Sequence, residues 1–185
     1  KIVSVISNRI NVYGLERAAN SGIPGLIVDH SEFETREHFD LALKQQIDTL
    51  EPDLVVLAGF MRILTEGFVQ HYQGKLINIH PSLLPKYKGI NTHQRALDDG
   101  AIKHGASVHF VSPELDGGPV ILQAEVAVKG DDNAETLAKR VLSQEHVIFP
   151  QVLEWLCADR LSLQDDGAIF FDGDTLHQPM IVNSP

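Results

Sequence analysis

Short apolar runs alternate with helical patterns through the first half of the chain, and this alternation limits the folds open to it. The runs predict strands at 1–7, 25–28, 54–59 and 76–80. The patterns between them predict helices at 13–21, 31–50 and 65–71, the second opened by a capping box of Ser31 and Glu34. A strand–helix–strand–helix order predicts parallel strands joined by right-handed crossovers, with helices on both faces of the sheet. We therefore expect an α/β fold.

The second half has a different pattern. Strands are predicted at 106–111 and 120–128, on either side of a turn-rich loop, and helices at 92–98 and 134–156. Pro150 should kink the longer helix. The segment 168–176 resembles a hairpin that turns at Asp172-Gly173. We expect antiparallel strands and a long helix here, and a single domain over 1–185, which suits the chain length.

Composition excludes several classes of protein. The formal net charge of -10 would repel nucleic acid and anionic membrane surfaces. A lone cysteine, Cys157, excludes an internal disulfide framework and is typical of a reducing compartment. The chain has no apolar run of about 20 residues that could cross a membrane. We expect a cytoplasmic protein with neither nucleic acid nor membrane as a partner.

The segment Asn78 to Pro85 carries the strongest chemical signal. Strand side chains alternate between faces, so Asn78 and His80 share one face. Pro81 cannot extend the hydrogen-bond ladder, which places both residues where the strand ends. Ligands bind at this end of the strands in open α/β sheets. An amide and an imidazole there could stabilise an oxyanion and exchange a proton.

Two motifs, Asn78 to Pro85 and Glu114 to Pro119, resemble those of the phosphoribosylglycinamide formyltransferases, also called glycinamide ribonucleotide transformylases. Segments 13–18, 55–64 and 143–146 extend the resemblance over essentially the whole chain. The resemblance implies an enzyme of purine biosynthesis. It would move a formyl group from 10-formyltetrahydrofolate, its co-substrate, to the amine of glycinamide ribonucleotide. It implies no metal, and a monomer or a homodimer.

The resemblance also implies roles for particular residues. The catalytic residues would be Asn78, His80 and Asp116. Folate contacts would come from one helix residue and from residues at or after the ends of predicted strands: Arg36, Met61, Arg62, Ile63, Leu64, Asn78, Ser112, Pro113, Glu114, Leu115 and Asp116. The ribonucleotide would contact Leu142, Ser143, Gln144 and Glu145.

The family begins with a strand and a glycine-rich loop that holds the substrate phosphate. This chain starts after that unit, by roughly 30 residues on a one-strand-one-helix allowance. We therefore expect a natural β-loop-α unit to precede Lys1. Without that unit, the chain would lack the loop that binds the substrate phosphate. It could then be an inactive folate-binding remnant.

Formyl transfer to an amine develops negative charge on the formyl oxygen. The Asn78 amide is the expected donor to that oxygen, worth about 2.7–4 kcal/mol. His80 could give a second hydrogen bond and help to protonate the departing folate nitrogen. Asp116, if it approaches, would favour the imidazolium. The nucleophile is the substrate amine, and its proton would leave through ordered water.

Other interpretations stay open at this point. A metal site of His80, His109 and Asp116 is conceivable, although no short ligand spacing supports it. Arg36 could be a solvated helix charge, and Met61 and Leu64 could be core residues. A formyltetrahydrofolate deformylase uses similar residues with water as nucleophile, but carries a regulatory domain. A methionyl-tRNA formyltransferase would need a basic RNA-binding domain.

Overall fold

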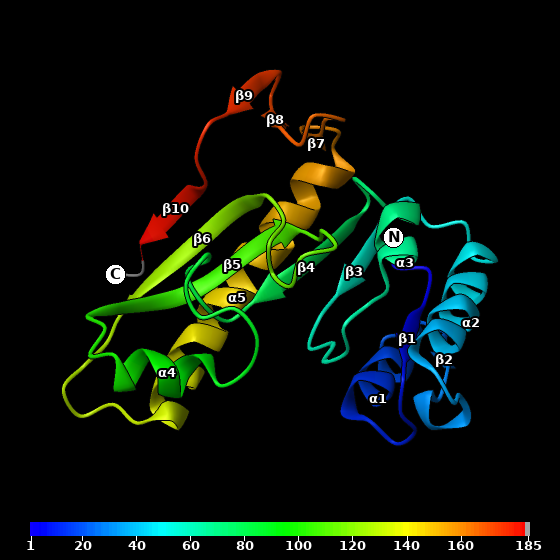
Figure 1. Cartoon of the computed structure of the whole chain (residues 1–185), viewed down its shortest axis with the longest axis horizontal. Coiled ribbons are helices and arrows are strands. Elements are labelled where there is room, and N and C mark those ends of the chain that lie inside the picture. The colour runs from blue at the N-terminus through cyan, green and yellow to red at the C-terminus, as the bar shows by residue number, and fades with distance from the viewer. Residues whose placement is uncertain (184–185) are drawn as a thin grey trace. The chain divides into compact units, whose positions relative to one another are not determined.

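The computed structural model describes residues 1–183 of the chain (Figure 1). The chain folds into two compact units. The first comprises residues 1–54 and 63–71, and the second comprises 55–62 and the chain from 72 onward. The single domain expected from the length stays a prediction.

The first unit begins with a strand–helix–strand crossover. Strand β1 (Val5–Ser7) pairs in parallel with β2 (Gly25–Ile27), and α1 (Tyr13–Asn20) packs on both strands. A 3-10 turn, η1 (His30–Glu32), then precedes α2 (Arg36–Asp48). The parallel pair with its connecting helix is the arrangement that the alternating pattern predicts.

The predicted start of the second helix is wrong. Asp29 Oδ1 accepts hydrogen bonds from both the backbone N and the hydroxyl of Ser31, which holds Ser31 in the 3-10 turn. Thr35 caps the helix instead, its Oγ1 accepting from His38 N at 3.2 Å. The helix therefore begins at Arg36. Ser31 therefore does not cap α2, because its hydroxyl and its backbone N–H are both bonded to the Asp29 carboxylate.

The core of this unit lies between α2 and α3 (Glu66–His71), which contact each other. Phe39 of α2 is fully buried and Phe68 of α3 nearly so. Thr65 caps α3 as predicted, its Oγ1 accepting from Phe68 N at 3.4 Å. The buried Asp40 carboxylate accepts from Thr65 N at 2.5 Å and so ties the start of α3 to α2.

The second unit contains a five-stranded sheet of order β10-β6-β5-β4-β3. Its strands are β3 (Val55–Leu57), β4 (Leu76–His80), β5 (Lys103–Phe110), β6 (Val120–Ala127) and β10 (Met180–Asn183). β3 pairs with β4 and β6 with β10 in parallel, whereas β4–β5 and β5–β6 are antiparallel. The α/β class is confirmed, as are the bounds of β4. β10 lies outside the predicted strands.

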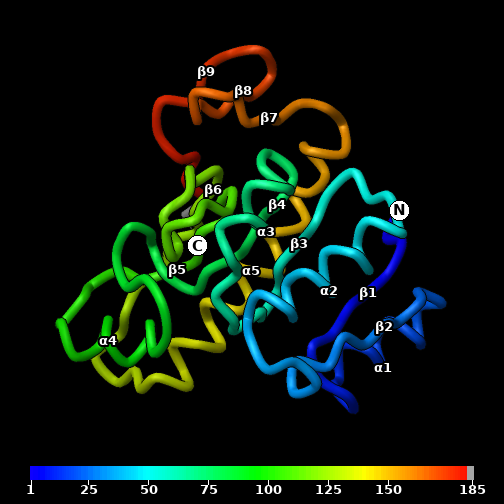
Figure 2. The backbone as a smooth tube through the Cα atoms, turned by 45° about the vertical axis from the view of Figure 1, so that its right-hand side comes forward, coloured from blue at the N-terminus to red at the C-terminus, as the bar shows by residue number. Residues whose placement is uncertain are grey.

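The long helix α5 (Ala134–Cys157) contacts β5 and β6 (Figure 2). Its apolar stripe is fully buried at Leu137, Val141, Ile148 and Val152. The helix continues through Pro150, and the kink expected there stays a prediction. The shorter helix α4 (Thr92–Asp98) packs on α5 and has the bounds predicted for it.

A small antiparallel sheet follows α5, formed by β7 (Leu161–Leu163), β8 (Ile169–Phe171) and β9 (Asp174–Leu176). The hairpin of β8 and β9 is confirmed, with Asp172 and Gly173 at positive φ in its turn. Trp155 of α5 makes an edge contact with Phe171, at 4.8 Å between ring centroids. Within residues 1–183, none of the helices has both the length and the apolar character needed to cross a membrane.

Candidate active site

The site is built where β4 ends. Asn78 lies directly opposite His109 of the antiparallel neighbour β5. The loop after β5 then turns back and carries Asp116, at φ 46°, to within 4.0 Å of His109 Nε2 and 3.5 Å of His80 Nδ1. Gly118 lets this loop pass close to the strand end, because a Cβ there would lie 1.9 Å from the Phe110 carbonyl oxygen. The sheet register and one glycine thus gather residues distant in sequence.

The orientation of the Asn78 amide follows from a chain of hydrogen bonds. His109 Nδ1 lies 2.9 Å from the Phe110 carbonyl, which can only accept, so Nδ1 carries the proton. In the neutral ring Nε2 is then an acceptor, and it receives a hydrogen bond from Asn78 Nδ2 at 3.1 Å. The second hydrogen of that amide group is left for a ligand.

Burial keeps His109 in the neutral form that this arrangement needs. The side chain is 1% exposed. Burial lowers the pKa of His109, and the smaller opposing effects come from the Phe110 carbonyl and the Asp116 charge. A protonated His109 would present an N–H to the Asn78 amide group and lose this hydrogen bond.

His80 and Asp116 form a close, nearly buried pair. His80 Nδ1 lies 3.5 Å from Asp116 Oδ2, and the two side chains are 7% and 11% exposed. The other ring nitrogen, Nε2, lies 2.9 Å from the Tyr87 carbonyl and must donate to it. Asp116 Oδ2 also accepts from Gly89 N at 2.8 Å. Nδ1 is therefore the ring nitrogen that faces the carboxylate.

The structure brings Asn78, His80 and Asp116 together, and it adds His109. From the sequence, His109 is a candidate only as a metal ligand. The cross-strand register with Asn78 is the signal that could have revealed it, since register places paired residues about 5 Å apart. The Tyr87 carbonyl and the Gly89 amide were also missed, and backbone groups leave no such signal in a sequence.

A metal at His80, His109 and Asp116 does not fit this geometry. Both ring nitrogens of His109 and the Nε2 of His80 are already engaged in hydrogen bonds. Within residues 1–183, no group of three or more His, Cys, Asp or Glu side chains could hold a metal ion.

The residues expected to contact folate lie on loops and a helix start. Met61, at 80% exposed, and Arg62 belong to the second unit, while Arg36, Ile63 and Leu64 belong to the first. Leu64 is buried, and Arg36 lies 3.7 Å from Glu37 in an exposed ion pair. Residues 112–116 form the loop that carries Asp116, and Leu115 on it is 49% exposed. Their roles stay predictions.

The residues expected to contact the ribonucleotide lie on α5. Leu142 is 47% exposed, and the Ser143 hydroxyl donates to the Arg140 carbonyl of its own helix. Burial raises the pKa of Glu145, with a smaller opposing effect from His146. Gln144 is partly exposed beside it. These contacts also stay predictions.

Comparisons with known proteins agree on one family. A family model described as formyl transferase matches residues 1–153. The phosphoribosylglycinamide formyltransferase of Escherichia coli (strain K12) is 51% identical over 94% of this chain and 81% of its own length. That of Haemophilus influenzae is 45% identical over 99% of this chain and 86% of its own length. The structure of the Coxiella burnetii enzyme, solved with CHES, is 49% identical, with a TM-score of 0.91 over 97% of this chain and 86% of that one.

Proposed function

This chain belongs to the formyl transferase family, and on that premise we propose that it formylates the amine of glycinamide ribonucleotide. The formyl donor is 10-formyltetrahydrofolate and the reaction is a step of purine biosynthesis. Two relatives that carry the name of this activity are 51% and 45% identical to the chain. The observation that carries the proposal is the meeting of Asn78, His80 and Asp116 at the end of β4.

Asn78 has the chemistry of an oxyanion donor. As the amine attacks the formyl carbon, the formyl oxygen takes up negative charge. A fixed, neutral N–H donor stabilises that charge without exchanging its own proton. One hydrogen of the Asn78 amide group is held by His109, which fixes where the other points. The donor is thus oriented before the substrate arrives.

The His80–Asp116 pair supplies the proton chemistry. The amine must lose a proton as its bond to carbon forms, and the folate nitrogen must gain one as it departs. A pair that can hold or release one proton at Nδ1 of His80 can serve both needs. The imidazolium form also places a positive charge near the developing oxyanion. Asp116 stabilises that form through its carboxylate.

The residues offered to the folate are chemically suited to it. When bound, 10-formyltetrahydrofolate supplies the activated formyl group. Its flat pterin ring calls for apolar side chains with a few polar partners. Met61 and Leu115 each leave apolar surface open, and the loop of residues 112–116 carries polar groups next to Leu115 in the chain. We assign folate contact to these residues and to Arg62 of the same unit. The contacts expected of Arg36, Ile63 and Leu64 stay predictions.

The test is to incubate the protein with 10-formyltetrahydrofolate, with and without glycinamide ribonucleotide. Release of tetrahydrofolate only when the amine is present supports the proposal. Release without the amine would instead show a hydrolase in which water is the nucleophile. Binding of the folate without turnover in either case would show an inactive folate-binding protein.

A further inference from the structure

The segment 86–90 connects both members of the proton pair through its backbone. The carbonyl of Tyr87 accepts from His80 Nε2 at 2.9 Å. Two residues later, the Gly89 amide donates to Asp116 Oδ2 at 2.8 Å. The position of this short segment therefore sets which nitrogen of His80 faces Asp116, and how close the carboxylate comes.

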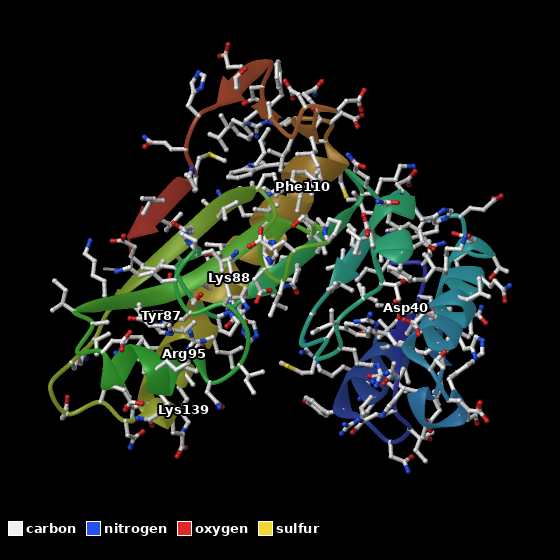
Figure 3. All side chains as sticks on the ribbon, in the orientation of Figure 1. Asp40, Tyr87, Lys88, Arg95, Phe110 and Lys139 are labelled. Carbon is white, nitrogen blue, oxygen red and sulfur yellow. The ribbon has the colours of Figure 1, made fainter. Side chains whose placement is uncertain are left out.

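Arg95 of α4 holds this segment from the other side. Its Nη1 donates to the Lys88 carbonyl at 2.7 Å, and a longer contact of 3.4 Å reaches the Ile90 carbonyl. Its guanidinium lies over the Tyr87 ring, at 5.6 Å from the ring centroid. Figure 3 shows Tyr87, Lys88 and Arg95 close together above α4. One side chain thus fixes three of the five residues in the segment.

The Tyr87 ring and the Lys88 side chain add further contacts to this segment. The Tyr87 ring makes an edge contact with the buried His104, at 5.8 Å between centroids. Lys88 Nζ donates to Glu114 at 2.7 Å, on the loop that carries Asp116. The glutamate is largely exposed, and the hydrogen bonds of Arg95 are exposed as well, so solvent weakens both sets of contacts. Arg95 is the anchor of residues 87–90 on the α4 side, and the buried Ser82 hydroxyl holds the start of the segment by donating to the Lys86 carbonyl at 2.6 Å.

We infer that Arg95 is a positioning residue for formyl transfer, acting through segment 86–90 on the His80–Asp116 pair. The guanidinium is planar and always charged, so it can donate to a carbonyl and stack on a ring together. If it is removed, the Lys88 carbonyl loses its charged donor and the Tyr87 ring loses its cover. The Tyr87 carbonyl then no longer holds the proton on His80 Nε2. The imidazole can adopt the other tautomer, and the shared proton loses its defined place.

The experiment compares Arg95→Ala with the wild-type chain in three measurements. These are turnover at saturating substrates, KM for 10-formyltetrahydrofolate, and the nitrogen NMR signals of the His80 ring. We expect kcat to fall about two- to tenfold, the range for the net loss of one ordinary hydrogen bond, because the Arg95 hydrogen bonds are exposed. KM should change by less than about twofold, since no folate contact is removed. The His80 signals should shift toward a mixture of tautomers.

Arg160→Ala is the matched control. Arg160 also places a guanidinium over an aromatic ring, Phe171, at 5.0 Å, and forms two hydrogen bonds to Asp172. These contacts belong to the small sheet of β7–β9 and not to segment 86–90. Its removal should leave both kcat and the His80 signals unchanged. Arg95→Lys should recover part of the turnover, because an ammonium can still donate to the Lys88 carbonyl.

Unchanged turnover in Arg95→Ala would overturn the inference. So would a loss of kcat with unmoved His80 signals, because the defect would then lie elsewhere. Should Arg95→Ala fail to fold, Arg95→Lys decides by the same measurements. The inference rests on the proposed formyl transfer. Because the ring signals need no turnover, they separate its failure from a failure of the proposed function.

Discussion

Replacing His109 tests how the Asn78 donor is oriented. In His109→Leu the side-chain volume is roughly kept. Asn78 Nδ2 loses its acceptor, however, and the Phe110 carbonyl loses its donor. The Asn78 amide is then free to rotate away from the formyl oxygen. A net hydrogen bond is worth about 0.5–1.5 kcal/mol. At about 1.36 kcal/mol per tenfold, kcat should fall by about two- to thirteen-fold.

Asn78→Ala removes the oxyanion donor itself and therefore sets the upper limit for the loss of kcat expected from His109→Leu. That change should lower kcat by about 10²–10³. The order of the two variants is therefore predicted, with His109→Leu the milder. Both are measured as formyl transfer at saturating substrates, with thermal unfolding to show that each variant is folded.

His109→Gln provides the control for this prediction. Its amide oxygen can accept from Asn78, so it should recover part of the lost turnover. The reasoning would be refuted if His109→Leu lowered kcat as much as Asn78→Ala, or if it left kcat unchanged while Asn78→Ala abolished activity.

Two further predictions concern buried groups near the site. Burial, with smaller effects from His93 and His80, lowers the pKa of His104 from 6.5 to about 4. The folded chain then binds fewer protons than the unfolded chain below pH 6.5, so stability is full above that pH and falls as the pH drops toward 4. Between pH 7 and 5, the free energy of unfolding measured in urea should fall by about 2 kcal/mol because of this group alone. His104→Phe should remove that part of the pH dependence. An unchanged dependence would contradict the assignment. Separately, Gly118→Ala places a Cβ 1.9 Å from the Phe110 carbonyl, the acceptor of His109, and should cost about 1–3 kcal/mol of stability together with turnover. Gly130→Ala, with nothing within 4 Å of its Cβ, is the control and should do neither.

Local patterns in the sequence predicted the elements around the site well. The apolar run before Pro81 gave the bounds of β4, and Gly100 with a helical pattern gave those of α4. These signals work because strand alternation and helix termination are local. The predicted start of α2 was wrong because the Ser31 hydroxyl donates to Asp29, two residues earlier, and so does not cap the helix. β10 was not predicted because this short strand is stabilised by its pairing with β6, and no local sequence pattern indicates that pairing.

In the site, too, the features that depend on neighbours in the sequence could be predicted, and those that depend on tertiary contacts could not. Asn78 and His80 could be placed together from their spacing alone, because they share one strand. The approach of Asp116 depends on how the loop after β5 turns, which Gly118 makes possible but does not specify. Arg95 and segment 86–90 act through carbonyl and amide groups that every residue possesses. Only the folded chain reveals which of those groups are used.

The most direct test of the account is the turnover of Asp116→Asn beside its affinity for the folate. The amide keeps the shape of the side chain and an oxygen for Gly89 N, but loses the negative charge that faces His80 Nδ1. The account predicts that kcat falls by about 10² or more, while the dissociation constant for 10-formyltetrahydrofolate changes by less than about twofold. Undiminished turnover, or an equal loss of turnover and folate binding, would contradict it.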